Sequence, residues 1–156
     1  MAFADLTGFT RLTEERGDEA AAELGRALAS IVQRGSRTHG GRMVKLMGDG
    51  AMLHFPDPVE GVLFGLDVVE RGPALGLPPA RVGLHAGPVI RQDGDYYGRT
   101  VNIAARVAGR ASPGEVLVTA DVVGAFSGEV AFSEMGEVML KGLANPIVLY
   151  RAAKSG

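Results

Sequence analysis

The sequence contains no cysteine, and this absence excludes two kinds of structural feature. Without thiols the chain forms neither a disulfide nor a thiolate metal centre. Any metal site must therefore be built from oxygen or nitrogen ligands. A chain without cysteine suits a reducing compartment, and we expect the protein to act in the cytoplasm.

Long apolar runs and a strong excess of charge are absent as well. The longest apolar runs fall far short of the roughly 18 residues that a membrane-spanning helix needs. The opening Met-Ala-Phe-Ala-Asp lacks the basic region of a signal peptide. The formal net charge of −2 gives no general attraction to nucleic acid or to an anionic membrane, so we expect contact with neither.

Several common catalytic motifs are missing. There is no G-x-x-x-x-G-K-[ST] phosphate loop, no G-x-G-x-x-G after a strand and no G-x-S-x-G. The three histidines, His39, His54 and His85, show no ligand-like spacing. We expect His54 and His85 to be hydrogen-bonded residues of the core or its rim, and Tyr96 and Tyr97 to serve packing.

Glycine, in contrast, is abundant. The 156 residues include 23 glycines, about twice the ordinary share of roughly 7%. Many stand beside polar residues at predicted turns, which is typical of loops that bring backbone close to a ligand. The length suits one domain, spanning residues 1–156, with a substantial core.

Hydrophobic periodicity predicts an α+β protein. We expect Thr10 or Thr13 to cap a helix that has Glu14 and Glu15 in its first turn. The predicted elements are a strand over 2–6, a helix over 18–37, a hairpin over 42–55, a helix after Pro56-Asp57-Pro58, a strand over 81–90, a polar loop over 92–98, a helix over 100–110, a strand over 115–119, a helical turn over 120–126 and strands over 130–140 and 147–152. This order predicts an α/β sandwich with a ferredoxin-like βαββαβ core, an extra helix and a C-terminal α/β extension.

Two aspartates fall at predicted strand ends. In a ferredoxin-like sheet Asp5, near the end of the first strand, and Asp49, at the hairpin turn, can converge on a cation. Hard oxygen ligands without cysteine favour Mg²⁺ or Mn²⁺. The link through Gly8, Phe9 and Thr10 presents backbone N–H groups at a helix start, where phosphate binds well. The alternative is that both aspartates are solvated turn residues.

Further polar residues have patterns that suit a nucleotide. Asn102 and Arg106 are four residues apart and share one helix face, where they can clamp a phosphate and a sugar. Lys45, in a strand whose other residues look buried, and Asp95 offer the donor and acceptor that an adenine edge requires. For Asn102 and Arg106 the alternative is an ordinary surface pair, and for Lys45 and Asp95 it is a salt bridge. For Lys141 it is a solvated loop lysine.

These residues belong to four segments that together resemble the catalytic domain of class III adenylyl/guanylyl cyclases of the bacterial type. The resemblance covers nearly the whole chain and keeps the family's order of motifs. The segments are Phe-Ala-Asp-Leu-Thr-Gly-Phe-Thr at 3–10, Lys-Leu-Met-Gly-Asp-Gly at 45–50, Asp-Tyr-Tyr-Gly-Arg-Thr-Val-Asn-Ile-Ala-Ala-Arg at 95–106 and Leu-Lys-Gly at 140–142.

The resemblance implies an adenylyl cyclase that serves signal transduction. ATP is converted into 3′,5′-cyclic AMP and pyrophosphate by in-line attack of the ribose 3′-hydroxyl on the α-phosphorus. The family pattern implies that Asp5 and Asp49 hold two Mg²⁺ or Mn²⁺ ions, with the carbonyl of Leu6 as a further ligand.

The resemblance also assigns roles to the remaining polar residues. Arg106 stabilises the charge at the α-phosphate, Asn102 orients the ribose and Lys141 holds the terminal phosphates. Lys45 and Asp95 select adenine. Relatives that use GTP usually carry Glu and a small or Cys-like residue at these two positions, so the pair favours ATP.

Finally, the resemblance implies a homodimer with two composite sites. One chain supplies Asp5 and Asp49 to each site, and its partner supplies the residues that bind base, ribose and α-phosphate. The competing hypotheses are a guanylyl cyclase and a non-catalytic, nucleotide-binding dimerisation module.

Overall fold

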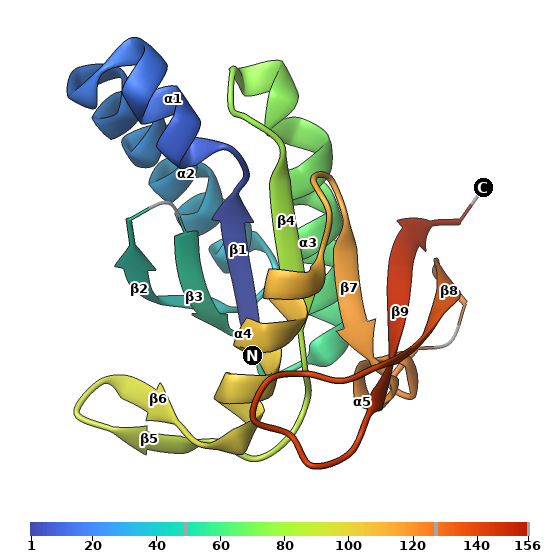
Figure 1. Ribbon diagram of the computed structural model, residues 1–156. Helices are drawn as coiled ribbons and strands as arrows, with labels where there is room; N and C mark the ends of the chain where they lie inside the picture. The colour runs from blue at the N-terminus through green and yellow to red at the C-terminus, as the bar shows by residue number, and fades with distance from the viewer. Residues whose placement is uncertain (49, 127, 156) are drawn as a thin grey trace.

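The computed structural model describes residues 1–48, 50–126 and 128–155. Within them the strands form a seven-stranded sheet in the order β2-β3-β1-β4-β7-β9-β8 and a separate two-stranded hairpin (Figure 1). The strands of the large sheet are β1 (Ala2–Leu6), β2 (Arg42–Met47), β3 (Gly50–His54), β4 (Ala80–Leu84), β7 (Val116–Thr119), β8 (Val130–Val138) and β9 (Ile147–Lys154). The hairpin consists of β5 (Ile90–Gln92) and β6 (Asp95–Tyr97).

The helices lie mostly between consecutive strands of this sheet. In the described part of the chain no helix combines the length and the apolar character that crossing a membrane requires. The helices are α1 (Phe9–Arg16), α2 (Asp18–Thr38), α3 (Pro58–Arg71), the short 3₁₀ turn η1 (Pro73–Leu75), α4 (Arg99–Arg110) and α5 (Ala120–Val123).

The ferredoxin-like core predicted from the sequence is confirmed. Strand β1 lies between β3 and β4 and runs antiparallel to both. The four strands β2-β3-β1-β4 and the helices between them have the βαββαβ connectivity. Strand β7 then extends the sheet parallel to β4, and β9 and β8 complete the far edge.

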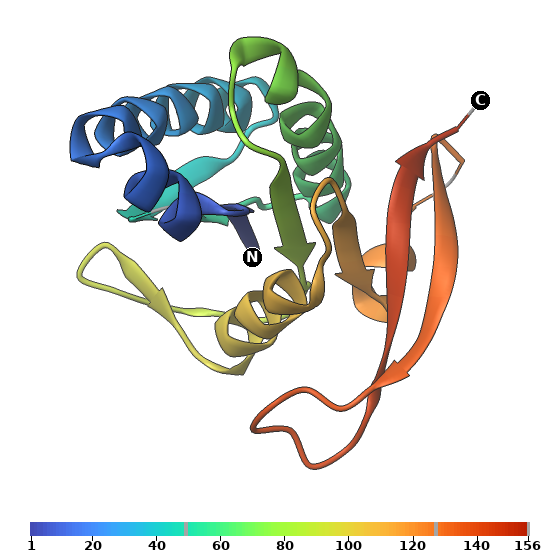
Figure 2. The same cartoon turned by 45° about the horizontal axis from the view of Figure 1, so that its top comes forward.

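The helices cover the two faces of the sheet (Figure 2). Helices α2 and α3 pack on one face through apolar side chains that include Leu28, Val32 and Phe64. Helix α4 covers the opposite face with Ala104 and its neighbours. It approaches the sheet so closely at Gly83 that a Cβ there would lie 2.1 Å from the backbone nitrogen of Ala108. The result is the expected α/β sandwich.

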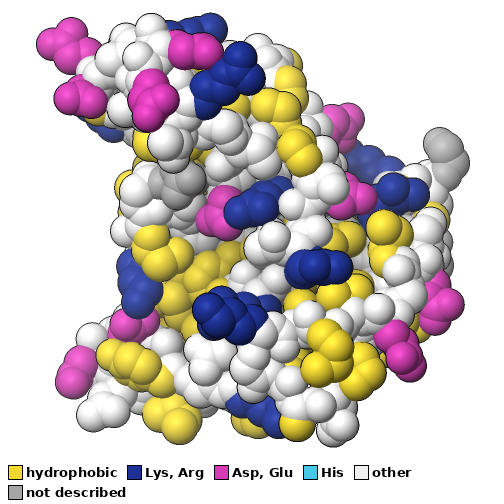
Figure 3. Space-filling view, in the orientation of Figure 1, with side chains coloured by type: hydrophobic (Ala, Val, Ile, Leu, Met, Phe, Trp, Pro, Cys, Tyr) yellow, Lys and Arg dark blue, Asp and Glu magenta, His cyan; other side chains and the backbone are white. Residues whose placement is uncertain are grey.

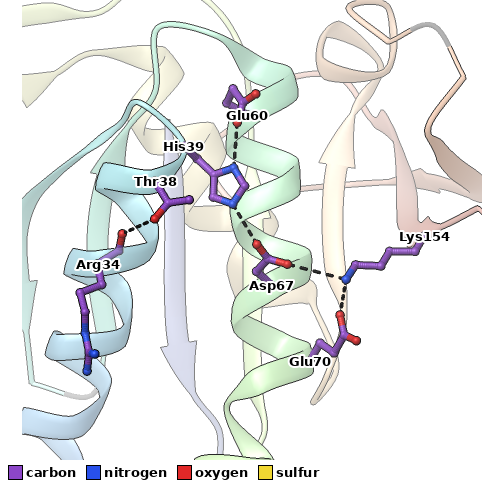
Figure 4. A network of polar contacts seen from close by, with 7 residues as sticks. All are labelled: Arg34, Thr38, His39, Glu60, Asp67, Glu70 and Lys154. Atoms are coloured by element: carbon purple, nitrogen blue, oxygen red, sulfur yellow. Dashed lines mark hydrogen bonds and ion pairs between the residues drawn. The ribbon is translucent and has the colours of Figure 1, made fainter.

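A polar network fastens the carboxyl end of α2 to α3 and β9 (Figure 4). His39 contacts Glu60 through Nδ1 at 2.7 Å and Asp67 through Nε2 at 2.9 Å. Lys154 in β9 reaches Asp67 at 3.7 Å and also pairs with Glu70. Elements far apart in the chain are therefore joined on the side of the molecule that α2 and α3 cover.

Two predictions for residues 81–98 are wrong. Strand β4 ends at Leu84 instead of continuing to Ile90, and the predicted polar loop over 92–98 is part of the β5–β6 hairpin. Ile90 pairs with Tyr97 across this hairpin, and its turn has Asp93 and Gly94 at φ 53° and 77°. A hairpin of two three-residue strands is too short to show periodicity, which is why the sequence did not reveal it.

The predicted cap of the first helix is also wrong, whereas the predicted start of a helix at Pro56-Asp57-Pro58 is confirmed. Gly8, at φ 69°, stands at the N-cap of α1, and Thr10 lies inside the helix. The Thr13 hydroxyl donates to the carbonyl of Phe9 instead of capping. At α3 the Asp57 side chain accepts from the backbone N–H of Val59 at 2.9 Å.

Strand β2 differs from the buried strand that its sequence suggests. It is an edge strand, and Lys45, Leu46 and Met47 are all exposed. Leu46 and Met47 have exposed fractions of 45% and 36%. The alternation of apolar residues does not report position in a sheet, because an edge strand and a central strand can share the same pattern.

Candidate active site

Asp5 lies at the carboxyl end of β1, as predicted. It is opposite Gly50 in β3 and Arg81 in β4. A Cβ on Gly50 would come within 2.0 Å of Oδ1 of Asp5. Glycine at position 50 therefore leaves the space that the carboxylate occupies.

Arg81 is the residue near this site that the sequence analysis missed. Its Nε is buried, lacks a hydrogen-bond partner among the described residues and lies 4.0 Å from Oδ2 of Asp5. Its Nη1 donates to the carbonyl of Gly109, at the end of α4, at 3.4 Å. An arginine inside an apolar strand was the available signal, the same kind of signal that singled out Lys45.

The residues present suit a divalent cation. The Asp5 carboxylate and the Leu6 carbonyl are hard oxygen donors of the type that Mg²⁺ and Mn²⁺ prefer. The predicted second ligand, Asp49, lies outside the described residues, and within those residues no three His, Asp or Glu side chains gather into a metal site.

The predicted phosphate loop leads from β1 into α1. Thr7 is fixed to the neighbouring connection, because its backbone N–H and its hydroxyl both donate to the carbonyl of Pro79, at 2.9 and 2.6 Å. Gly8 follows at the N-cap, and Phe9 and Thr10 form the first helical residues. In this described segment no side chain caps the helix. The first-turn N–H groups therefore point toward the region beyond β1, where an anion would be favoured.

Lys45 and Asp95, which the sequence analysis assigned to base recognition with a salt bridge as the alternative, lie in contact in the single chain. Lys45 Nζ donates to Oδ2 of Asp95 at 3.0 Å, and the backbone N–H of Tyr96 donates to Oδ1 at 2.8 Å. Two hydrogen bonds lower the pKa of Asp95 below its usual value of 3.8. The one from Lys45 has the larger effect, and the one from the Tyr96 backbone is second. The carboxylate is therefore ionised at neutral pH and held in one orientation.

Asn102, Arg106 and Lys141 also come together. They line one open pocket of about 460 Å³ between α4 and the loop that follows β8. The rest of its described lining consists of Gly98, Arg99, Ile103, Gly142 and Leu143. The spacing of four residues places Asn102 and Arg106 on the exposed face of α4, while Ile103 and Val107 are buried. This pocket combines an amide with several positive charges.

These groups form separate clusters in one chain. Asp5 is absent from the described lining of the α4 pocket, and so are Lys45 and Asp95. The face drawn in Figure 3 carries Lys and Arg side chains across its middle, around a hollow where hydrophobic side chains are exposed. Such a face suits a polyanionic ligand with an apolar part.

His85 has the rim position predicted for it. It follows β4, its Nδ1 lies 2.6 Å from the hydroxyl of Thr119, and its Nε2 lies 3.9 Å from Asp121. Burial lowers the pKa of His85 below 6.5, against the opposite effect of Asp121. Of the two tyrosines, Tyr96 is packed as expected, whereas Tyr97 has an exposed fraction of 51%.

Comparison of the sequence with protein families identifies one matching domain. The family described as "Adenylate and Guanylate cyclase catalytic domain" matches residues 1–152. A pH-sensitive adenylate cyclase of Mycobacterium tuberculosis is 34% identical over 163 residues, which cover 99% of this chain and 40% of that protein. An adenylate cyclase of Streptomyces coelicolor is 36% identical over 119 residues, covering 76% of the chain and 31% of that protein. The chain thus spans two fifths or less of the length of these relatives.

Solved structures give the same result for the fold. The adenylyl cyclase CyaB from Pseudomonas aeruginosa superimposes with a TM-score of 0.88 at 25% identity, over 99% of this chain and 93% of that one. The catalytic core of a rhodopsin-guanylyl cyclase with converted specificity, in complex with ATPαS, superimposes with a TM-score of 0.89 at 23% identity. The match covers 98% of this chain and 93% of that one. Every strand and helix that carries a predicted site residue lies within the matched part of the chain.

Proposed function

Because this chain belongs to the adenylate and guanylate cyclase catalytic domain family, we propose that residues 1–156 form an adenylyl cyclase domain that converts ATP into 3′,5′-cyclic AMP and pyrophosphate. The observation that carries the proposal is the contact between Lys45 and Asp95. An ammonium group can donate to adenine N1, and a carboxylate can accept from the N6 amino group. Guanine presents a donor at N1 and an acceptor at O6, so the same pair opposes it.

The α4 pocket supplies groups for the sugar and the phosphates. The planar guanidinium of Arg106 can bind two oxygens of the α-phosphate, where charge increases during in-line attack. The amide of Asn102, one turn away, orients the ribose, and Lys141 across the pocket holds the terminal phosphates. These groups position the 3′-hydroxyl and the α-phosphorus for reaction.

Asp5 and Asp49, with the Leu6 carbonyl, are the residues that would hold two Mg²⁺ or Mn²⁺ ions. When bound, these ions lower the pKa of the 3′-hydroxyl and neutralise phosphate charge. The guanidinium of Arg81 adds a positive charge 4.0 Å from the Asp5 carboxylate. The first-turn N–H groups of Phe9 and Thr10 add donors for phosphate oxygens.

A homodimer would join the separate clusters into complete sites. Asp5 contributes to one site of the dimer, while Lys45, Asp95, Asn102 and Arg106 contribute to the other. The exposed apolar residues support this arrangement, because Leu46 and Met47 on β2 and Ile90 and Tyr97 on the hairpin lie on the same two elements as the base-binding pair. Apolar side chains that gather in this way mark interaction surfaces.

The relatives favour the adenylyl reaction over the guanylyl reaction. The two described above, at 34% and 36% identity, are both named as adenylate cyclases. Guanylyl cyclase is the second candidate, because several guanylyl cyclase domains share the fold. A non-catalytic module is the third, and only turnover separates it from the other two.

A direct assay tests the proposal. Purified protein is incubated with Mn²⁺ and ATP or GTP, and the cyclic products are separated by chromatography over a range of protein concentrations. We expect cyclic AMP in excess over cyclic GMP, with activity per mole that rises as dimers form. A larger yield of cyclic GMP would favour the guanylyl reaction, and binding of nucleotide without either product would favour the non-catalytic module.

A further inference from the structure

The ring of Tyr96 contacts two side chains from the seven-stranded sheet. On one side the imidazole of His54 stacks on it, with ring centroids 4.7 Å apart and an interplanar angle of 14°. Nearby, the guanidinium carbon of Arg42 lies over the ring, 5.6 Å from its centroid. His54 and Arg42 are directly opposite each other in β3 and β2. Tyr96 thus meets the end of the β2–β3 pair.

This contact matters because the β5–β6 hairpin is a separate sheet. Among the described residues its strands pair only with each other and add no ladder to the seven-stranded sheet. Side-chain contacts therefore contribute to the position of the hairpin. Tyr96 is the hairpin residue best placed to do so, since its exposed fraction is 8%, against 63% for Ile90 and 51% for Tyr97. It also joins the apolar cluster of Phe3 and Met52 beneath α4.

The position of the Tyr96 backbone directly affects the position of the Asp95 carboxylate. The two residues are adjacent, and the backbone N–H of Tyr96 donates to Oδ1 of Asp95 while Lys45 donates to Oδ2. A shift of the Tyr96 backbone would rotate or displace this carboxylate relative to Lys45. The strand β2 that carries Lys45 is the same strand that carries Arg42, so the stack and the ion pair connect the same two elements.

The chemistry of the stack explains why an aromatic residue is needed. Burial lowers the pKa of His54 below 6.5, so its ring is neutral near pH 7 and stacks without adding charge. The face of Tyr96 attracts the guanidinium of Arg42 through its ring quadrupole. Leucine could fill much of the same volume, but it offers neither a flat face nor an attraction for a cation. The hairpin would then be free to move against β2.

We propose that Tyr96 is a positioning residue for base selection, in which its ring, held by His54 and Arg42, fixes Asp95 beside Lys45 so that the pair matches adenine. The inference rests on the proposed function, because it assumes that Lys45 and Asp95 contact the base. Tyr96 acts through Asp95. The groups that bind metal and phosphate lie elsewhere, so loosening the stack should change selection more than turnover.

The test compares Tyr96→Leu with the matched variant Tyr96→Phe, which keeps the ring. Binding of 3′-deoxy-ATP and 3′-deoxy-GTP, which lack the attacking hydroxyl, is measured by calorimetry, and kcat and KM are measured for ATP and GTP. We expect the binding preference for the adenine nucleotide to fall about tenfold in Tyr96→Leu, with kcat at saturating ATP within about twofold of the wild type. Tyr96→Phe should keep the preference of the wild type.

Several outcomes would overturn the inference. An unchanged preference in Tyr96→Leu, or an equal loss in Tyr96→Phe, would show that the stacked ring does not set the base-binding pair. A fall of kcat for both nucleotides with unchanged selectivity would show a structural role alone. If Tyr96→Leu does not fold, Arg42→Met replaces it, because this variant keeps the stem and removes the cation, and a preference unchanged from the wild type would again refute the role.

The proposed function fails in a distinguishable way. If wild-type protein neither binds nor converts nucleotides, the base-binding assignment itself is wrong. If wild-type protein prefers ATP and the Tyr96→Leu variant prefers it equally, only the role of Tyr96 is wrong.

Discussion

Lys45 and Asp95 are fifty residues apart in the chain, yet their side chains meet at 3.0 Å. The pair joins the edge strand β2 to the hairpin β5–β6. The Lys45 side chain is about half exposed, and the Asp95 side chain is a quarter exposed. An exposed ion pair of this kind adds little stability. Its significance therefore lies in what the two groups can recognise.

Exchange of this pair should change nucleotide preference. In the double variant Lys45→Glu with Asp95→Gly, the new glutamate carboxylate can accept a hydrogen bond from guanine N1–H. Loss of the Asp95 carboxylate removes its repulsion of guanine O6, since both groups are acceptors. We expect the ratio of kcat/KM for ATP over GTP to fall about 100-fold, since each base contact is worth roughly 1–3 kcal/mol. Arg91→Glu with Asp93→Gly makes the same exchange at exposed positions of the hairpin and should leave the ratio unchanged. Undiminished ATP preference in the first variant would contradict the assigned roles.

Replacement of Asp5 by asparagine should weaken metal binding. The amide keeps the shape that the space beside Gly50 accommodates but removes the charge that attracts a cation. We expect turnover to fall at least about 100-fold, because metal ions supply several kcal/mol of charge stabilisation. The affinity for Mn²⁺ should fall in parallel, and it is measured from the electron paramagnetic resonance signal of the unbound ion. Turnover lost with unchanged Mn²⁺ affinity would assign Asp5 to another task.

Two inactive variants should restore activity when they are mixed. Asp5→Asn removes the residue that one chain supplies, and Arg106→Ala removes the residue that its partner supplies. In a mixed dimer one site loses both residues and the other keeps both. After subunit exchange of equal amounts, half of the dimers are mixed, so about one quarter of wild-type activity should return. Each variant alone is the control, and a mixture that stays inactive would place both residues in a single-chain site.

Loss of His39 should lower the stability of the fold. Both of its ring nitrogens contact carboxylates of α3, and Lys154 extends the network to β9 (Figure 4). We expect His39→Leu to reduce the free energy of unfolding by about 1–2 kcal/mol, because Glu60 and Asp67 lose a shared partner. Denaturation by urea measures the change. Arg34→Ala removes only an exposed hydrogen bond to Ser30 and should have little effect.

His85 should make stability depend on pH. Burial lowers its pKa below 6.5, so between the folded and unfolded pKa values the unfolded chain binds more protons. The stabilisation is present above about pH 6.5 and is lost as the pH falls through the folded pKa. We expect the free energy of unfolding to decline over this window in the wild type and to decline less in His85→Gln. The two proteins are compared by urea denaturation at pH 8, 6.5 and 5, and equal slopes would contradict this origin.

Much of the fold was predictable because it depends on local patterns. Apolar residues at helical spacing marked α2, α3 and α4, and Asp57 before Pro58 marked the start of α3. The β5–β6 hairpin was missed because a turn between two three-residue strands leaves no periodic signal. The cap of α1 was misassigned because threonines stand near Gly8, while the left-handed backbone at that position suits glycine.

The sequence by itself determined the order of the elements, the family to which the chain belongs and the residues worth examining, since these depend on local composition and on motifs in order. Only the tertiary structure decided which of those residues meet. Strand order makes β2 an exposed edge, and register sets Arg81 opposite Asp5. Tyr96 stacks on His54, and Asp95 beside it lies within reach of Lys45. Such contacts join segments far apart in the chain, and no local pattern encodes their distances.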